Sequence, residues 1–220
     1  MKRALTAAAA LVLAVTMAGC SSKSSSSSSV KEKEAPDMFI SRQEFEKSFA
    51  DVEDTEKGPL LSIESVTAKP GETAAVSISV DTPDHNWAMC GLHITYSEEL
   101  ECETNGDSEM VKYIVGEACG ENPHTSAMKW QGDLPEDLAS AHMKMLFFAA
   151  LMSEEVGTSG KIATFYFKVP EDAKSGETYD LSYYYHSSES TKDMFTTLDG
   201  DEAYEKYAFS HFTGGTITVE

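Results

Sequence analysis

The chain has 220 residues, of which 37 are Asp or Glu and only 17 are Lys or Arg, so its formal net charge is −20 at pH 7. This charge argues against a nucleic-acid-binding protein, because phosphates require neutralisation by Lys and Arg. It also argues against a protein that lies flat on an anionic membrane, and it favours a soluble domain held away from the surface.

The first twenty residues have the pattern of a bacterial lipoprotein signal. A basic start, Lys2 and Arg3, precedes the apolar run 5–15, which is shorter than the about 20 residues that a membrane span needs. The Ala-Gly pair before Cys20 resembles a lipobox, in which cleavage leaves the cysteine as a lipid-modified N-terminus. An ordinary cleaved signal that contains a cysteine is the alternative.

Cleavage before Cys20 would remove residues 1–19 with both basic residues, and the net charge would become −22. The Ser-rich residues 20–36 cannot build a core and are predicted to be a lipidated tether. The predicted location is therefore the extracellular side of the cell membrane, with the protein lipid-anchored.

Residues 37–57 are predicted to be a short helix followed by an acidic linker. Phe39, Ile40, Phe45 and Phe49 recur at near-helical spacing, with Asp37 as a possible cap. The pattern then breaks in the acidic run that ends at Gly58 and Pro59. We expect the folded domain to span residues 58–220.

From residue 60 onwards the hydrophobic pattern has a period of two, which is typical of strands. The turn-bounded segments predicted as strands are 61–66, 74–80, 87–97, 99–105, 110–117, 126–133, 161–170, 178–186 and 214–220, whereas 134–141 predicts a helical turn in a connecting loop. Many short strands separated by Gly-containing turns predict an all-β fold, a two-sheet sandwich preceded by a short N-terminal helix.

The segment 144–152, "KMLFFAALM", is apolar on both faces. Periodicity alone does not distinguish a strand from a helix in so short a run. Its place between strands favours a strand, and a helix is the alternative.

Beyond Cys20 the chain has three cysteines, an odd number that cannot be fully paired. Cys90 lies in an apolar strand and is interpreted as a small buried hydrophobe. Cys102 and Cys119 could form a disulfide in an oxidising exterior, or remain free.

The sequence contains no catalytic motif: it has no H-E-x-x-H, no G-x-S-x-G and no phosphate-binding glycine loop. We therefore expect a protein that is not an enzyme, without a cofactor or metal of its own. One weak exception is "LDGDEAYE", where Asp199, Asp201 and Glu202 could supply oxygen ligands for calcium. This segment lacks the alternating loop and the distal Glu of an EF-hand.

Exposed aromatic side chains are a second candidate for binding chemistry. The run "YDLSYYYH" contains Tyr179, Tyr183, Tyr184 and Tyr185, and alternation must turn at least one of them outward. Together with Trp130, such rings could stack on sugars or serve as protein hot spots. The alternative is that most of them fill the core.

The order of the segments "VTAKPGET", "AAVSISVDTP", "WAMCGLHITYSEELE", "HMKMLFFAA", "GKIATFYFKVPEDAKSGETYDLSYYY" and "TGGTITVE" resembles a cohesin domain. Cohesins are the modules of cellulosome scaffoldins that bind the dockerin modules of plant-cell-wall enzymes. The resemblance covers about Leu60 to Glu220 and implies a non-catalytic jelly-roll sandwich of about nine strands. It also implies a dockerin-containing partner, whose own fold would need calcium.

The resemblance implies a partner-binding face as well. Its residues, matched position by position, are Met89, Gly91, His93, Trp130, Phe147, Ala149, Thr164 and Tyr166. The best-known cohesins carry Asn and Asp where Met89 and Gly91 stand, and an acid near Leu151. Polar recognition is thus replaced here by apolar and small groups, which would bind through hydrophobic hot spots.

The leading functional hypothesis is a cell-surface cohesin-like lipoprotein that binds dockerin-bearing proteins and so anchors polysaccharide-degrading machinery. Two alternatives remain: a carbohydrate-binding module of the same sandwich type that binds polysaccharide through Tyr and Trp, and a structural envelope protein whose sandwich packs on its own N-terminal helix.

Overall fold

The computed structural model describes residues 41–54, 57–82, 87–106, 108–187 and 191–220. The predicted signal peptide, Cys20, the tether and the possible cap Asp37 lie outside the described residues. Among the described residues, no helix is long and apolar enough to cross a bilayer.

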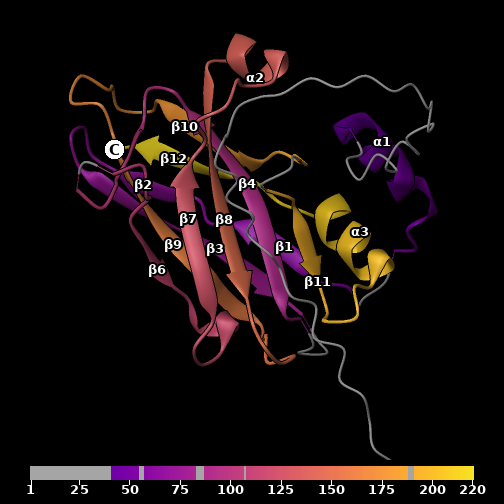
Figure 1. Ribbon diagram of the computed structural model, residues 1–220. Coiled ribbons are helices and arrows are strands. Elements are labelled where there is room, and N and C mark those ends of the chain that lie inside the picture. Colours follow the sequence, from indigo (N-terminus) through magenta and orange to yellow (C-terminus); the bar gives the residue numbers. More distant parts are fainter. Residues whose placement is uncertain (1–40, 55–56, 83–86, 107, 188–190) are drawn as a thin grey trace, which may run out of the picture. The chain divides into compact units, whose positions relative to one another are not determined.

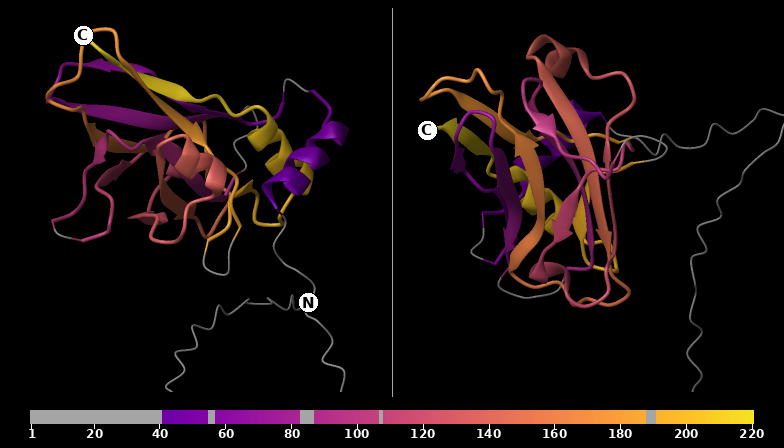
Figure 2. Two further views of the ribbon diagram at one scale, coloured as in Figure 1. Left: turned by 90° about the horizontal axis from the view of Figure 1, so that it is seen from above. Right: turned by 90° about the vertical axis from the view of Figure 1, so that its left-hand side faces the viewer.

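The domain consists of two β-sheets that lie in two layers, as Figure 2 shows in its right-hand view. The first sheet has the order β1-β3-β9-β5, with β6 also paired to β9. Its strands are β1 (Leu60–Ile63), β3 (Thr73–Asp81), β5 (Glu101–Cys102), β6 (Tyr113–Val115) and β9 (Gly160–Lys168).

The second sheet has the order β2-β12-β10-β4-β8-β7, with β11 paired to β4 beyond the end of β10 (Figure 1). Its strands are β2 (Val66–Ala68), β4 (Met89–Ser97), β7 (His124–Lys129), β8 (Met143–Leu151), β10 (Thr178–Tyr183), β11 (Met194–Thr196) and β12 (Gly215–Val219). The two-sheet all-β fold predicted from the sequence is therefore confirmed, although several strands are shorter and more broken than expected.

The core lies between the two sheets and is built from the alternating inward residues of both. Strand β4 contributes Leu92 and Ile94, β8 contributes Phe148, and β9 contributes Phe165 and Phe167, all of them buried. Phe148 and Phe165 meet edge-on across the layers, with ring centroids 5.6 Å apart. Burying side chains of this size stabilises the fold by about 1.5–3 kcal/mol each.

The apolar segment 144–152 is a strand, as its position between strands favoured. It forms β8 and pairs with β4 over nine residues, from Met89 opposite Leu151 to Ser97 opposite Met143. Phe148 lies in the core, whereas Phe147 is half-buried on the other side of the same strand.

Two short helical elements precede β1 in the chain, α1 (Arg42–Lys47) and the 3-10 turn η1 (Ser48–Asp51). A third, α3 (Glu202–Ser210), lies between β11 and β12. Helix α1 begins later than predicted, because Ser41 and Glu44 form a capping box there. Its Phe45 stacks on Tyr185 with centroids 3.9 Å apart and meets Phe209 of α3 edge-on. Residues 42–51 thus pack on the sandwich.

Helix α3 was missed in the sequence, where its first turn was considered as a calcium loop. Asp201 is instead the N-cap of α3, and its side chain accepts hydrogen bonds from the backbone N–H groups of Ala203 and Tyr204. Among the described residues no group of three or more His, Cys, Asp or Glu side chains could hold a metal ion. The calcium interpretation of this segment is therefore wrong.

The three cysteines of the domain are free and buried, so Cys102 and Cys119 do not form the disulfide that was considered. Burial raises the pKa of each of these two thiols to about 12. Cys119 lies in the 3-10 turn η2 (Glu117–Cys119), and its thiol donates to the carbonyl oxygen of Ile162 in β9. These cysteines act as core residues.

Candidate partner-binding face

The face of the second sheet that turns away from the core is called here the outer face, and β7, β8, β4 and β11 form it. Registered pairing places its residues in three rows across the strands. The rows are His124, Leu151, Met89 and Thr196; then Ser126, Ala149, Gly91 and Met194; then Met128, Phe147 and His93.

The open part of this outer face is apolar and lies over β7 and β8. Leu151 is 44% exposed and Met128 is 39% exposed, while Phe147 and Ala149 are half-buried between them. Side chains opposite one another on neighbouring strands are close enough to touch, so these residues form one surface. This surface can form a water-excluding contact with a flat apolar surface.

The part of the outer face over β4 is covered by the chain's own residues 184–187 and 191–193. The ring of His186 lies edge-on to the ring of His93, with centroids 5.0 Å apart. A Cβ on Gly91 would lie 2.5 Å from the carbonyl oxygen of Lys192, so glycine is required for this close approach. Gly91 and His93 are buried, and the prediction that they are exposed to a partner is wrong because of this cover.

A buried polar cluster holds the covering segment in place. Asp193 accepts a hydrogen bond from the backbone N–H of His93 at 2.7 Å, and its other oxygen accepts one from the backbone N–H of His186. The Nδ1 atom of His93 lies 3.1 Å from the same Asp193 carboxylate. Burial raises the pKa of Asp193, against the opposing effect of these donors, and burial lowers the pKa of His186.

Trp130 follows β7 and lies against this cluster. Its ring meets His93 and His186 edge-on, with centroids 5.4 and 4.8 Å away, and its Nε1 donates to the carbonyl oxygen of Asp133. Beside it, helix α2 (Glu136–Ser140) buries Leu138. The helical turn predicted at 134–141 is therefore present, and it closes one end of the outer face.

Two predicted site residues lie elsewhere. Thr164 and Tyr166 point outward from β9, which belongs to the first sheet, so they do not share a face with Phe147. Thr164 hydrogen-bonds Ser77 of β3 at 3.1 Å, and the ammonium group of Lys112 lies 4.9 Å from the Tyr166 ring centroid. The structure brings together Met89, Trp130, Phe147 and Ala149, with His93 and Gly91 beneath a cover.

Sequence reasoning missed two contributors to this face, Met128 and Met194, and it named Leu151 only as the position near which other cohesins carry an acid. Alternation was the available signal for Met128, which lies two residues from Trp130. Met194 lies in β11, a strand of three residues that leaves no recognisable period.

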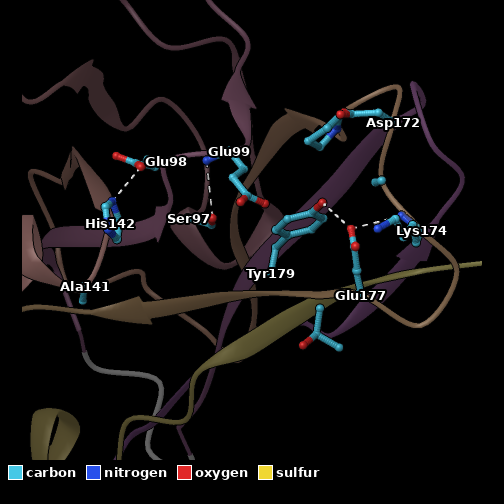
Figure 3. Close-up of a pocket in the computed structure, with 12 residues that line it drawn as sticks. Ser97, Glu98, Glu99, Ala141, His142, Asp172, Lys174, Glu177 and Tyr179 are labelled. Carbon is cyan, nitrogen blue, oxygen red and sulfur yellow. Dashed lines mark hydrogen bonds and ion pairs between the residues drawn. The ribbon is translucent and has the colours of Figure 1, made fainter.

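A cavity lies away from this face, where β4 ends and β10 begins (Figure 3). It measures 930 Å³ and its lining includes Glu98, Glu99, His142 and Glu177. The Nδ1 atom of His142 lies 2.8 Å from a Glu98 oxygen, and Glu177 accepts from the Lys174 backbone N–H at 3.0 Å. His142 and Glu98 are thus engaged with each other, and Glu177 is engaged by a backbone N–H group.

No protein-family model matches this sequence, and no curated protein matches it. Solved structures, in contrast, do match this chain. A type III cohesin module from the cellulosomal ScaE cell-surface anchoring scaffoldin of Ruminococcus flavefaciens superposes with a TM-score of 0.62 at 26% identity, covering 77% of this chain and 92% of that module.

Two more distant structures share the fold. The sixth cohesin of scaffoldin B from Acetivibrio cellulolyticus, solved with a dockerin, matches with a TM-score of 0.52 at 17% identity over 74% of this chain and 100% of its own. A non-cellulosomal cohesin from the archaeon Archaeoglobus fulgidus matches with 0.51 at 15% identity, over 74% of this chain and 91% of its own.

The class defined by the two sheets and their order is the jelly-roll β-sandwich. Within that class, the domain has the fold of cohesin modules, as the order of its sequence segments predicted.

Proposed function

We propose that this protein is a non-catalytic docking module that binds dockerin-bearing proteins through the outer face of β7, β8 and β4. The observation that carries the proposal is the apolar surface around Phe147, which no segment among the described residues covers, on a cohesin fold. Binding would hold polysaccharide-degrading enzymes at the cell surface.

The character of the surface supports a protein partner. Leu151, Met128 and Phe147 form an apolar centre, and polar residues such as Ser126 and His124 border it. An apolar centre with a polar rim is the usual anatomy of a specific protein interface. Two cohesins that share the fold have been solved in complex with a dockerin.

The test uses residues 37–220, which form one compact unit that includes α1. This protein is immobilised, and each dockerin module encoded in the genome of the source organism is passed over it with calcium present to fold the dockerin. We expect at least one module to bind with a Kd of about 1 μM or tighter, as expected for a specific interface. Binding of no module would overturn the proposal.

The proposed anchor is a lipid on Cys20, supported by the basic start, the apolar run and the Ser-rich segment that follows. Replacing Cys20 with Ala is expected to prevent lipidation and to release the protein from the membrane fraction, because the remaining chain is strongly acidic. Fractionation of cells that express the full chain measures this. Retention of the Cys20→Ala protein in the membrane would refute the lipid anchor.

The carbohydrate-binding alternative has less support. Within the described residues every Phe, Tyr and Trp side chain is buried or half-buried, and Trp130 packs edge-on against two histidines instead of presenting a flat ring. The packing of α1 on the sandwich is compatible with a structural role, and it does not account for the apolar outer face.

A further inference from the structure

Both ends of the outer face carry exposed carboxylates. At the end next to α2, called here the α2 end, these are Glu109, Asp133 and Asp137. Contacts place them there: Gln131 donates to Glu109 at 2.8 Å, and Tyr184 donates its hydroxyl to Asp137 at 3.0 Å.

The opposite end, where β8 and β11 finish, is called here the β11 end. Its exposed carboxylates are Glu154, Glu155 and Asp199. Glu155 accepts the backbone N–H of Leu198 at 3.2 Å, which joins the loop after β8 to the residues after β11. Leu198 itself is 46% exposed, so the apolar surface continues to this rim.

These six carboxylates are not neutralised within the part of the chain that the structure describes. None of them belongs to an ion pair there. The nearby cation Arg42, which lies 4.2 Å over the Tyr184 ring, is bound to Glu46 at 2.7 Å. Lys192 is exposed beside the apolar centre, and His124 is exposed opposite Leu151 at the β11 end.

We propose that the partner of this face presents an apolar strip flanked at both ends by Lys or Arg, which meet the carboxylates of the α2 end and the β11 end. This inference rests on the proposed function and specifies which dockerin-type partner the face selects. Strand β8 joins the two ends through nine residues, so they lie roughly 26 Å apart. An α-helix of about 17 residues spans that distance.

Charge at the border of an interface acts mainly on the association rate and on the exclusion of wrong partners. A partner with acidic ends would meet like charges at both rims, whereas one with basic ends would be attracted before contact. The apolar centre would make the same water-excluding contact with a partner of either charge. Among modules with equally apolar strips, the sign of the charge at the two ends therefore determines which module binds this face.

The experiment compares three double variants of residues 37–220 that each remove two negative charges. The α2-end variant is Glu109→Gln with Asp133→Asn, the β11-end variant is Glu155→Gln with Asp199→Asn, and the matched control, away from the face, is Glu64→Gln with Glu101→Gln. All six residues are exposed, so each protein is expected to fold. The probes are the dockerin modules that bind the unaltered protein, and the measurement is their association rate at low and high salt.

We expect each rim variant to lower the association rate about fivefold at low salt, whereas the control changes it less than twofold. In 1 M NaCl the difference should disappear, because the screening length falls to about 3 Å. Modules that bind with unchanged rates to the rim variants would overturn this inference and leave the proposed function standing. An equal effect of the control would also overturn it. Binding of no module to the unaltered protein would overturn the proposed function and, with it, this inference.

Discussion

Replacing Phe147 with Asp is expected to weaken binding of a dockerin module by more than a hundredfold. The substitution places a carboxylate at the centre of the apolar outer face, between Met128 and Ala149, where a bound partner would exclude water. Burying an unpaired charge at the centre of an interface costs about 3 kcal/mol or more, which corresponds to a factor of about 100 in Kd. Binding of purified 37–220 to the module identified above measures the effect.

The Phe147→Asp protein should remain folded, because the Phe147 side chain is half-buried and turned away from the core. A matched control is Ile114→Asp, which places the same charge at an apolar side chain that is 59% exposed on β6 of the first sheet. The control should bind like the unaltered protein. Full affinity in the Phe147 variant would exclude β8 from the interface.

Replacing Asp193 with Ala is expected to lower the free energy of unfolding by about 3–5 kcal/mol. The change removes the buried acceptor of the His93 and His186 backbone N–H groups and of the His93 ring. Each donor left without a partner in a buried site costs about 1–3 kcal/mol. Urea denaturation of residues 37–220, followed by circular dichroism, measures the loss.

Two further variants separate this effect from a general effect of charge. Asp180 is exposed on β10, so Asp180→Ala should change the free energy of unfolding by less than about 0.5 kcal/mol. Asp193→Asn keeps one acceptor oxygen and should fall between the two. If Asp193→Ala costs no more than Asp180→Ala, the buried cluster does not stabilise the covering segment.

Much of the fold could be predicted from the sequence because a period of two is a local signal. It correctly assigned β8 as a strand and correctly separated inward Phe148 from outward Phe147. Helix α3 was missed although Tyr204, Tyr207 and Ala208 have helical spacing after the cap Asp201. The acidic, Gly-containing start of the segment suggested a metal loop, and a cap uses the same residue types.

The candidate site was less predictable, since it depends on long-range placement. Alternation shows on which side of a strand His93 lies, but it does not reveal that residues 186 and 192 of a distant segment cover that side. In the same way, the outward positions of Thr164 and Tyr166 were right, and the assignment of their strand to the sheet of β8 was wrong. Sheet membership is set by pairing between distant residues, and no local pattern encodes it.

Strand β8 has a consequence for how this protein can evolve. Its successive residues Phe147 and Phe148 belong to two independent requirements, the outer surface and the packed interior. On the proposed function, mutations at every second position would change the choice of partner with little loss of stability, while the intervening positions remain under selection for folding. A lineage would then acquire new partners by substituting Phe147, Ala149 and Leu151 in single steps that each leave the packed interior intact.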